Sequence, residues 1–174
     1  MTDGQDHTPE GNSAIIGVYT ILSLSVVFLF TPIVPVFVTG TFLLPVALFI
    51  AWLLRFNKSE DSLVYNHMIY ISRTIWMFSV IMTVTTAIAG VVIINYADNS
   101  VYTNMINDMM NGIGYSTPQA FDVMIQYIKA NLALMIVAGL FCLLPTLGYI
   151  AYRLIHGFSR ALKGYRLAKP KSWL

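Results

Sequence analysis

Three long stretches of the chain contain no Asp, Glu, Lys or Arg and consist mainly of apolar residues. They run from Gly11 to Leu54, from Thr74 to Ala97 and from Ala130 to Tyr152. A helix needs about 20 consecutive apolar residues to cross a bilayer. Each stretch is long enough for at least one crossing, so the pattern predicts an all-α integral membrane protein.

The first stretch is too long for one crossing. A single helix over it would be about 66 Å long, roughly twice the thickness of the hydrocarbon core. Thr31, Pro32 and Pro35 lie near its middle, and proline removes a backbone donor and clashes with the preceding turn. We therefore expect a short hairpin of two helices, Ala14 to Phe30 and Phe37 to Leu54. A re-entrant hairpin that does not reach the far side is the alternative.

With the other two stretches, the chain has about four predicted transmembrane helices. The third, Thr74 to Tyr96, carries small and hydroxyl residues at helical spacing on one face: Ser79, Thr83, Thr86 and Gly90. Small residues let membrane helices approach closely, and hydroxyls bond to neighbouring groups, so we predict a helix-packing face. The alternative is a hydroxyl-lined ion path, which the lack of an ionisable group on this face disfavours.

The connection from Asp98 to Lys129 contains two predicted short helices. In the first, apolar side chains gather on one side: Met105, Ile106, Met109, Met110 and Ile113. This pattern predicts a lid on the outer membrane surface. Methionine thioethers can bind Cu(I), but methionine also fills apolar surfaces, which is the favoured interpretation. The second helix is expected to start near Ser116, with Thr117 as its cap and Pro118 at its first position.

Composition and charge place the chain in the membrane. Hydrophobic residues make up 57% of its 174 residues and charged residues 10%, against roughly 25% charged in an ordinary soluble domain. Nine of the ten Lys and Arg residues lie in two segments, Arg55 to Arg73 and Arg153 to Lys171. Cytoplasmic loops carry an excess of such residues. We therefore expect both segments and both termini on the cytoplasmic side of the membrane, with Asp98 to Asp122 outside.

These predictions divide the chain into three parts. Residues 1–13 form an acidic cytoplasmic N-terminus, and residues 14–155 form a transmembrane helical domain with an extracytoplasmic loop at 97–129. Residues 156–174 form a basic interfacial C-terminal segment. The N-terminus lacks the basic region of a secretory signal peptide, so we expect the first membrane helix to be retained.

Basic residues alternate with apolar ones after the last apolar stretch. Leu154, Phe158 and Leu162 interleave with a basic run. This pattern predicts a basic amphipathic C-terminal helix that leaves the fourth span along an anionic leaflet, and it favours membrane anchoring over nucleic-acid binding. The run comprises Arg153, His156, Arg160, Lys163, Arg166, Lys169 and Lys171.

Arg73 lies between Ile71 and Ile75, where a buried charge is costly unless it pairs or reaches the headgroups. Glu60 or Asp61 is a candidate partner, and snorkelling to lipid phosphate is the favoured interpretation. The candidate contacts with lipid or a partner subunit are Arg73, His67, Met105, Met109, Arg153, Arg160, Lys163 and Trp173.

The sequence offers little to support catalysis. His67 and His156 fall where spans meet cytoplasmic water, so we interpret them as interfacial polar side chains rather than as haem ligands. Cys142 is the only cysteine, so an intrachain disulfide is excluded. No acid and base lie at one depth for general acid–base chemistry. We predict no catalytic residue, no metal site, no cofactor and no enzymatic activity.

Two segments contain distinctive motifs. His67 is separated by five residues from Arg73-Thr74, and a basic C-terminal run ends in Pro170-Lys171-Ser172-Trp173. Over the last three-fifths of the chain, these features resemble an uncharacterised family of small bacterial multi-pass inner-membrane proteins with a His-x5-Arg-Thr segment and a Pro-x-Ser-Trp ending. His156 stands where arginine is common in that family, and the connection at 98–129 is longer than its short turn. The resemblance implies the fold and a bacterial origin but no activity.

The absence of recognisable chemistry leads to the predicted function. We expect a non-catalytic accessory or stabilising subunit of a larger bacterial inner-membrane complex, of respiratory or secretion type. Its partners would be the lipid bilayer and other membrane-protein subunits, with no nucleic acid. The alternative is a small homo-oligomeric transporter or channel in which Ser79, Thr83 and Thr86 line the path.

Overall fold

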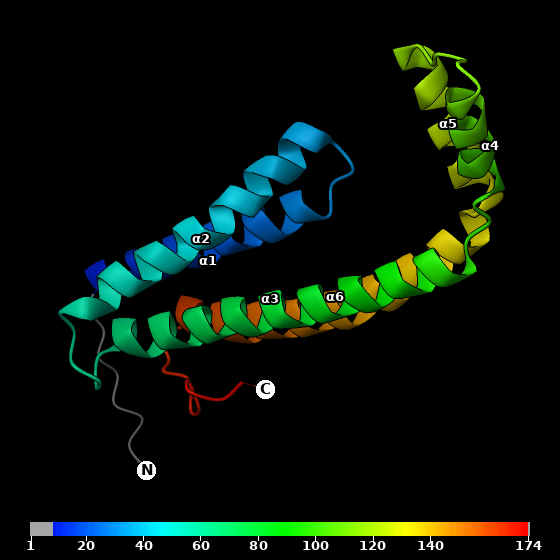
Figure 1. The fold of residues 1–174 in the computed structure, drawn as a ribbon. Coiled ribbons are helices and arrows are strands. Elements are labelled where there is room, and N and C mark those ends of the chain that lie inside the picture. Colours follow the sequence, from blue (N-terminus) through cyan, green and yellow to red (C-terminus); the bar gives the residue numbers. More distant parts are fainter. Residues whose placement is uncertain (1–8, 174) are drawn as a thin grey trace. The chain divides into compact units, whose positions relative to one another are not determined.

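The computed structural model describes residues 9–173, and no β-strand occurs within them. Six helices follow one another along the chain (Figure 1). They are α1 (Pro9–Leu29), α2 (Val34–Phe56), α3 (Leu63–Tyr96), α4 (Ser100–Met110), α5 (Thr117–Ala130) and α6 (Leu132–Leu162). Most of the predicted acidic N-terminus, residues 1–8, lies outside the described part.

Four helices are long and apolar enough to cross a membrane: α1 over Asn12–Leu29, α2, α3 and α6. This confirms the predicted all-α membrane protein with about four transmembrane helices. The two helices between α3 and α6 have 11 and 14 residues, which is too short for a crossing of about 20 residues.

The predicted hairpin is present, because α1 and α2 pack side by side (Figure 1). Residues 30–33 form the turn. Pro35 lies in the first turn of α2, where a missing backbone donor costs no intrahelical bond. For this reason α2 starts at Val34, before the expected Phe37.

Gly40 is a point of very close approach between α1 and α2. A Cβ atom added to Gly40 would lie 2.7 Å from the Leu29 backbone nitrogen and 2.9 Å from the Ser25 carbonyl oxygen. The Ser25 hydroxyl donates a 2.8 Å hydrogen bond to the Gly40 carbonyl oxygen. The buried residues of α2 are all small, namely Gly40, Ala47 and Ala51, as expected where membrane helices pack closely.

Helix α3 begins earlier than the sequence suggested, at Leu63 rather than near Thr74. A charge such as Arg73 marks a probable membrane boundary, but it does not end a helix. The additional turns are held by packing, since Met68 and Ile71 are fully buried. His67 and Arg73 therefore lie within α3, and the helix fixes the direction in which each side chain leaves the backbone.

The predicted basic C-terminal helix is shorter than expected. Helix α6 ends at Leu162, and Gly164 adopts a left-handed conformation with φ of 71°. The Gly164 N–H donates to the Ala161 carbonyl oxygen and the Tyr165 N–H to the Arg160 carbonyl oxygen. This pair of bonds is the Schellman motif that terminates helices. Residues 163–173, which we call the C-terminal segment, are not helical, which corrects the prediction of a helix along this run.

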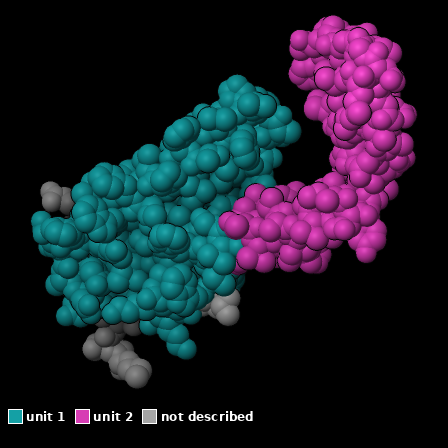
Figure 2. Space-filling model, viewed as in Figure 1, with its two compact units in different colours: residues 1–80, 147–174 teal, residues 81–146 magenta. Residues whose placement is uncertain are grey.

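The chain divides into two compact units. Unit 1 contains residues 1–80 and 147–174, and unit 2 contains residues 81–146 (Figure 2). Helices α3 and α6 contribute to both units. The core of unit 1 joins α1, α2, α3 and α6, and its side chains include Ile15, Leu22, Met68, Ile71 and Ile150.

In unit 2, α3 meets α6 at a small polar contact. The Cys142 thiol lies 3.3 Å from the Thr85 hydroxyl and 3.4 Å from the Thr86 hydroxyl. Thr86, one residue of the predicted packing face, therefore contacts α6. Thr83 on the same face is exposed, and a Cβ added to Gly90 would meet open space. In unit 1, Ser79 is also exposed. Packing of this face against another chain stays a prediction.

Candidate functional site

Two features are candidates for function: the C-terminal segment in unit 1 and the α4–α5 pair in unit 2. The C-terminal segment folds back onto the first turns of α3. The Asn66 side chain donates to the Leu167 carbonyl oxygen at 3.0 Å, and its amide oxygen accepts from the Leu167 N–H at 2.8 Å. Asn66 is buried. Because Leu167 is not in a helix, its N–H and carbonyl oxygen have no helical partners, and the Asn66 side chain bonds both of them instead.

His67 connects α1 to the C-terminal segment. Its Nε2 lies 3.0 Å from the Tyr165 carbonyl oxygen and its Nδ1 lies 3.1 Å from the Tyr19 hydroxyl. A carbonyl oxygen only accepts, so we assign the proton to Nε2, and Nδ1 then accepts from Tyr19. The ring is fully buried and both nitrogens are engaged within the chain. His67 is therefore a buried connector within the chain, which corrects its expected place among the contacts with lipid or a partner subunit.

Arg73 binds the C-terminal segment of its own chain. Its guanidinium donates to the Lys171 carbonyl oxygen and lies over the Trp173 ring, 4.7 Å from the centroid. Arg73 thus contacts neither of the expected carboxylates, since Glu60 instead pairs with the Lys171 ammonium at 3.7 Å. The Tyr149 hydroxyl also donates to the Trp173 carbonyl oxygen at 3.1 Å.

Arg153 is buried, with 2% of its surface exposed, which corrects its expected place on a lipid-facing helix. Its guanidinium carbon lies 3.7 Å from the Tyr70 ring centroid, and its Nε donates to the Thr74 hydroxyl at 3.0 Å. The Tyr70 hydroxyl donates back to the Arg153 carbonyl oxygen at 3.2 Å. An aromatic face attracts a cation most strongly when water is excluded, which is why the charge is tolerated here.

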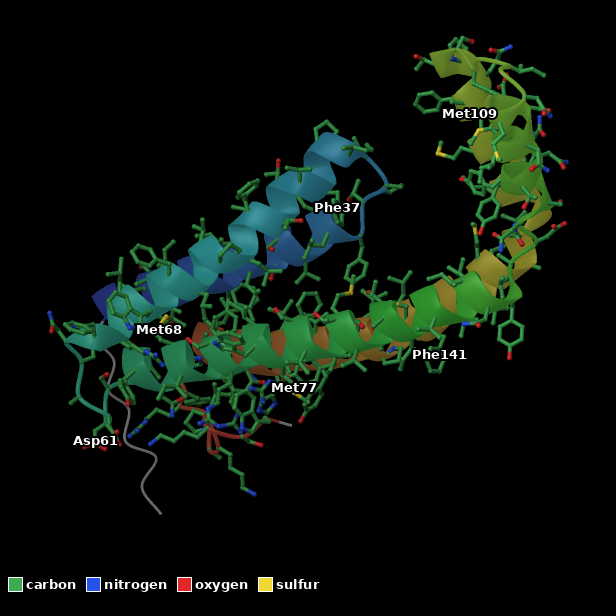
Figure 3. All side chains as sticks on the ribbon, viewed as in Figure 1. Phe37, Asp61, Met68, Met77, Met109 and Phe141 are labelled. Carbon is green, nitrogen blue, oxygen red and sulfur yellow. The ribbon has the colours of Figure 1, made fainter. Side chains whose placement is uncertain are left out.

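The remaining basic candidates differ in their roles. The Arg160 guanidinium donates to the Arg166 carbonyl oxygen at 2.9 Å and so fixes the start of the C-terminal segment. Arg166 in turn donates to the Glu60 carbonyl oxygen at 3.3 Å. Lys163 is exposed. Figure 3 shows nitrogen-bearing side chains gathered around the C-terminal segment.

The α4–α5 pair carries exposed apolar side chains on two helices that are too short to span. No side chain of α4 is buried, and Val123 is the buried residue of α5. The helices contact each other through Tyr102 and Tyr127, whose ring centroids are 4.5 Å apart. The exposed apolar side chains are Ile106, Met109, Met110, Ile113, Phe121, Met124, Ile125 and Ile128 (Figure 3, where Met109 is labelled). Met105 is half-buried.

Hydrogen bonds fix the base of this pair. Asn131 accepts from the Asp98 N–H at 2.7 Å and donates to the Asp98 carbonyl oxygen at 3.0 Å. The Ser100 N–H donates to the Asp98 carboxylate, which lowers the pKa of Asp98 below its ordinary value. At the other end, the Tyr115 hydroxyl donates to Asp108 at 2.7 Å, and this bond raises the pKa of Tyr115.

The second helix of the pair starts one residue earlier than expected. Ser116 is the N-cap, so Thr117 is the first helical residue and Pro118 the second. The Gln119 side chain accepts from the Ser116 N–H at 2.8 Å, as in a capping box.

Replacing Asn131 by leucine is expected to loosen the base of the α4–α5 pair. The change removes both bonds to Asp98 and the bond to the Tyr127 carbonyl oxygen, each worth about 0.5–1.5 kcal/mol. We expect faster hydrogen–deuterium exchange over residues 98–110, measured by mass spectrometry in detergent. The control is Asn104→Leu, because Asn104 is exposed on α4. Equal protection in the two variants would contradict a structural role for Asn131.

Fold and contacts together define the class: an all-α, multi-pass integral membrane protein. Within residues 9–173, no group of three or more His, Cys, Asp or Glu side chains is placed to hold a metal ion. Comparison of the chain with protein families, with curated proteins and with solved structures finds no match. The resemblance of its C-terminal motifs to a bacterial inner-membrane family stays a prediction.

Proposed function

We propose that the protein is a non-catalytic accessory subunit of a larger bacterial inner-membrane complex, of respiratory or secretion type, and that the α4–α5 pair binds a second, unlike subunit. The observation that carries this proposal is the exposed apolar surface of α4 and α5. Each helix presents one such face, because Ile106, Met109 and Met110 recur at helical spacing on α4 and Phe121, Met124 and Ile125 do so on α5.

The pair cannot be stabilised by a core of its own. Isolated helices of this length are marginal in water, and in the pair only Val123 is buried. Met109 is 56% exposed and Phe121 57% exposed. Contiguous apolar surface outside the spans is typical of an interaction site. A partner surface would bury these side chains.

Charge favours a protein partner over the bilayer surface. Interfacial helices that bind anionic lipid carry Lys and Arg on their polar face. Residues 98–129 instead contain Asp98, Asp108 and Asp122 with Lys129 as the only basic residue. The polar side of the pair is otherwise rich in asparagine. We therefore propose a partner with an apolar groove flanked by basic or amide side chains.

The proposed orientation follows from the distribution of basic residues. Nine of the ten Lys and Arg residues lie in two segments of unit 1, 55–73 and 153–171, and the positive-inside rule places such basic segments on the cytoplasmic side. In this orientation the α4–α5 pair lies on the extracytoplasmic side. Both termini are then cytoplasmic.

Site-specific cross-linking tests the proposed surface. A photoreactive amino acid at position 109, in native membranes, is expected to link the chain to one unlike polypeptide. The same group at position 104, on the polar side of α4, is the matched control and is expected to give at least several-fold less product. Cross-links from position 109 to lipid alone, or equal products from both positions, would contradict a protein partner.

Removing the apolar side chains should separate the subunits without unfolding the chain. The double variant Ile106→Ser and Met109→Ser changes two side chains that are 52% and 56% exposed, so its thermal stability in detergent should stay near the wild-type value. Co-purification of the unlike subunit is expected to fall at least about tenfold. Unchanged co-purification of the unlike subunit would show that these two residues are not part of the interface.

A homo-oligomeric transporter is the second candidate, because Ser79 and Thr83 are exposed on the membrane helix α3. The Ser79 hydroxyl, however, donates to the Ile75 carbonyl oxygen of its own helix at 2.9 Å, and such a bond satisfies a hydroxyl in lipid without any path. If copies of the chain do form a path, Thr83→Phe would abolish flux into proteoliposomes while membrane insertion is retained. Unchanged flux would eliminate this candidate.

A further inference from the structure

Arg153 is a buried cation whose contacts include no carboxylate. Its neighbours are the Tyr70 ring, the Thr74 hydroxyl and the Tyr149 ring. The Arg153 guanidinium carbon lies 6.0 Å from the centroid of the Tyr149 ring. In unit 1, Glu60 and Asp61 are the acidic residues whose side chains the structure describes. Glu60 is engaged by the Tyr65 hydroxyl and the Lys171 ammonium. A buried charge normally has an ionic partner, and among the side chains that the structure describes no carboxylate pairs with Arg153.

Arg153 lines a basic cavity between α3, α6 and the C-terminal segment. The cavity has a volume of about 250 Å³. Its polar lining consists of Tyr70, Tyr152, Arg153, His156, Arg160 and Lys169. Three of these side chains are cations at neutral pH, and the lining includes no carboxylate. Like charges held around one cavity repel each other, and a bound anion offsets that cost.

Two of the three cations are held in place by contacts within the chain. Arg153 is fixed by Thr74 and Tyr70, and Arg160 is fixed by the Arg166 carbonyl oxygen. His156 stacks on Tyr152 with ring centroids 5.9 Å apart. Binding of an anion would therefore order few additional side chains, which favours affinity.

We propose that this cavity binds the phosphate group of an anionic membrane phospholipid. Arginine presents planar donors that match phosphate oxygens, and two of the three cations here are arginines. The volume lies below the roughly 300–1,000 Å³ of pockets that enclose a drug-sized molecule. It suits a headgroup whose acyl chains remain outside.

The position of the cavity along α6 favours a lipid over a soluble anion. The charge-free part of the chain ends at Tyr152, and Arg153 is the first charge after it. This is the depth at which phospholipid phosphates lie, next to the end of the hydrocarbon core. Tyr152, which lines the cavity, and Ile155, which is close to it in sequence on α6, are 62% and 71% exposed, so apolar surface for acyl chains adjoins the charged lining.

The proposal is independent of the proposed function and is tested on the full-length protein. Delipidated protein in neutral detergent is titrated with phosphatidylglycerol or phosphatidylcholine, and retained lipid is counted by native mass spectrometry. The variants are Arg160→Gln and Lys169→Gln, whose side chains are half-buried and exposed and are therefore less critical for folding than Arg153. Lys163→Gln is the matched control, since Lys163 is exposed on the same basic run outside the cavity.

We expect wild-type protein to prefer phosphatidylglycerol and each cavity variant to lose roughly fivefold in its affinity, as one basic residue near a membrane surface contributes. Lys163→Gln should retain the wild-type affinity. An equal loss in Lys163→Gln, or no loss in either cavity variant, would overturn the proposal. In a second experiment the delipidated protein is titrated with millimolar inorganic phosphate. Saturable binding of phosphate without lipid, together with loss of the preference for phosphatidylglycerol, would assign the cavity to a soluble anion and overturn the lipid assignment.

Discussion

Gly40→Ala is expected to destabilise the α1–α2 hairpin by about 1–3 kcal/mol, as overpacking of a close contact does. The added Cβ would lie 2.7 Å from the Leu29 backbone nitrogen and 2.8 Å from the Phe28 Cβ. Both atoms are held by the backbone of α1 and cannot rotate away from the added Cβ. The helices would have to separate, which also lengthens the bond from Ser25 to the Gly40 carbonyl oxygen.

Gly17→Ala provides the matched control on the same hairpin, because a Cβ on Gly17 meets no atom within 4 Å. Alanine favours a helix over glycine by about 1 kcal/mol in water, so this control should be neutral or stabilising. The free energy of unfolding is measured by circular dichroism as sodium dodecyl sulfate displaces a mild detergent. Equal stability of the two variants would contradict the close approach at Gly40.

Gly157→Ala is expected to cost a similar 1–3 kcal/mol, by disturbing the packing of α6 against α1 and α3. A Cβ on Gly157 would clash with the Tyr19 hydroxyl and lie 2.8 Å from Tyr70 Cε1. Both rings are buried, and Tyr19 is held by His67. Relief would require breaking the Tyr19–His67 bond or moving the Tyr70 ring, on which Arg153 lies.

Gly148→Ala is the control on the same helix, since nothing lies within 4 Å of its added Cβ. A double-mutant cycle sharpens the test. Tyr19→Phe removes the hydroxyl that the new Cβ meets, so Gly157→Ala should cost less in that background than in the wild type. Additive effects would place the strain elsewhere than at Tyr19.

Features set by local sequence were predictable. The charge-free stretches gave the number of membrane helices, and Pro32 and Pro35 located the turn of the hairpin, because length and backbone chemistry decide both. The exposed methionines of α4 were also visible as a periodic pattern. These properties depend on neighbours within a few positions.

Features set by distant contacts were not predictable. Arg153 was expected at the lipid surface, and its burial depends on Tyr70 and Thr74, about eighty positions away in the chain. Likewise His67 is engaged by Tyr165 and Tyr19. A basic residue after an apolar stretch usually marks the interface, but this pattern does not show whether its side chain faces lipid or is buried against other helices of the chain.

Glycine illustrates the same distinction. Gly90 was predicted to lie on a packing face, but a Cβ there meets no atom of the chain within 4 Å, while Gly40 and Gly157 are the close contacts. Glycine is frequent in membrane helices, and only the facing helix decides which one is needed. Gly164 ends α6 through local chemistry, because glycine after a basic last turn favours a helix stop, but the basic run led us to expect a helix beyond it.

Binding of unlike subunits through α4 and α5 is the central property proposed for this chain. The most direct measurement is to extract it from its native membrane in mild detergent, determine the particle mass, and identify every polypeptide in the particle. We predict unlike subunits in a fixed ratio, absent from the particle formed by the Ile106→Ser and Met109→Ser variant. A homogeneous assembly of this chain alone, unchanged by that variant, would contradict the account and move the transporter to first place.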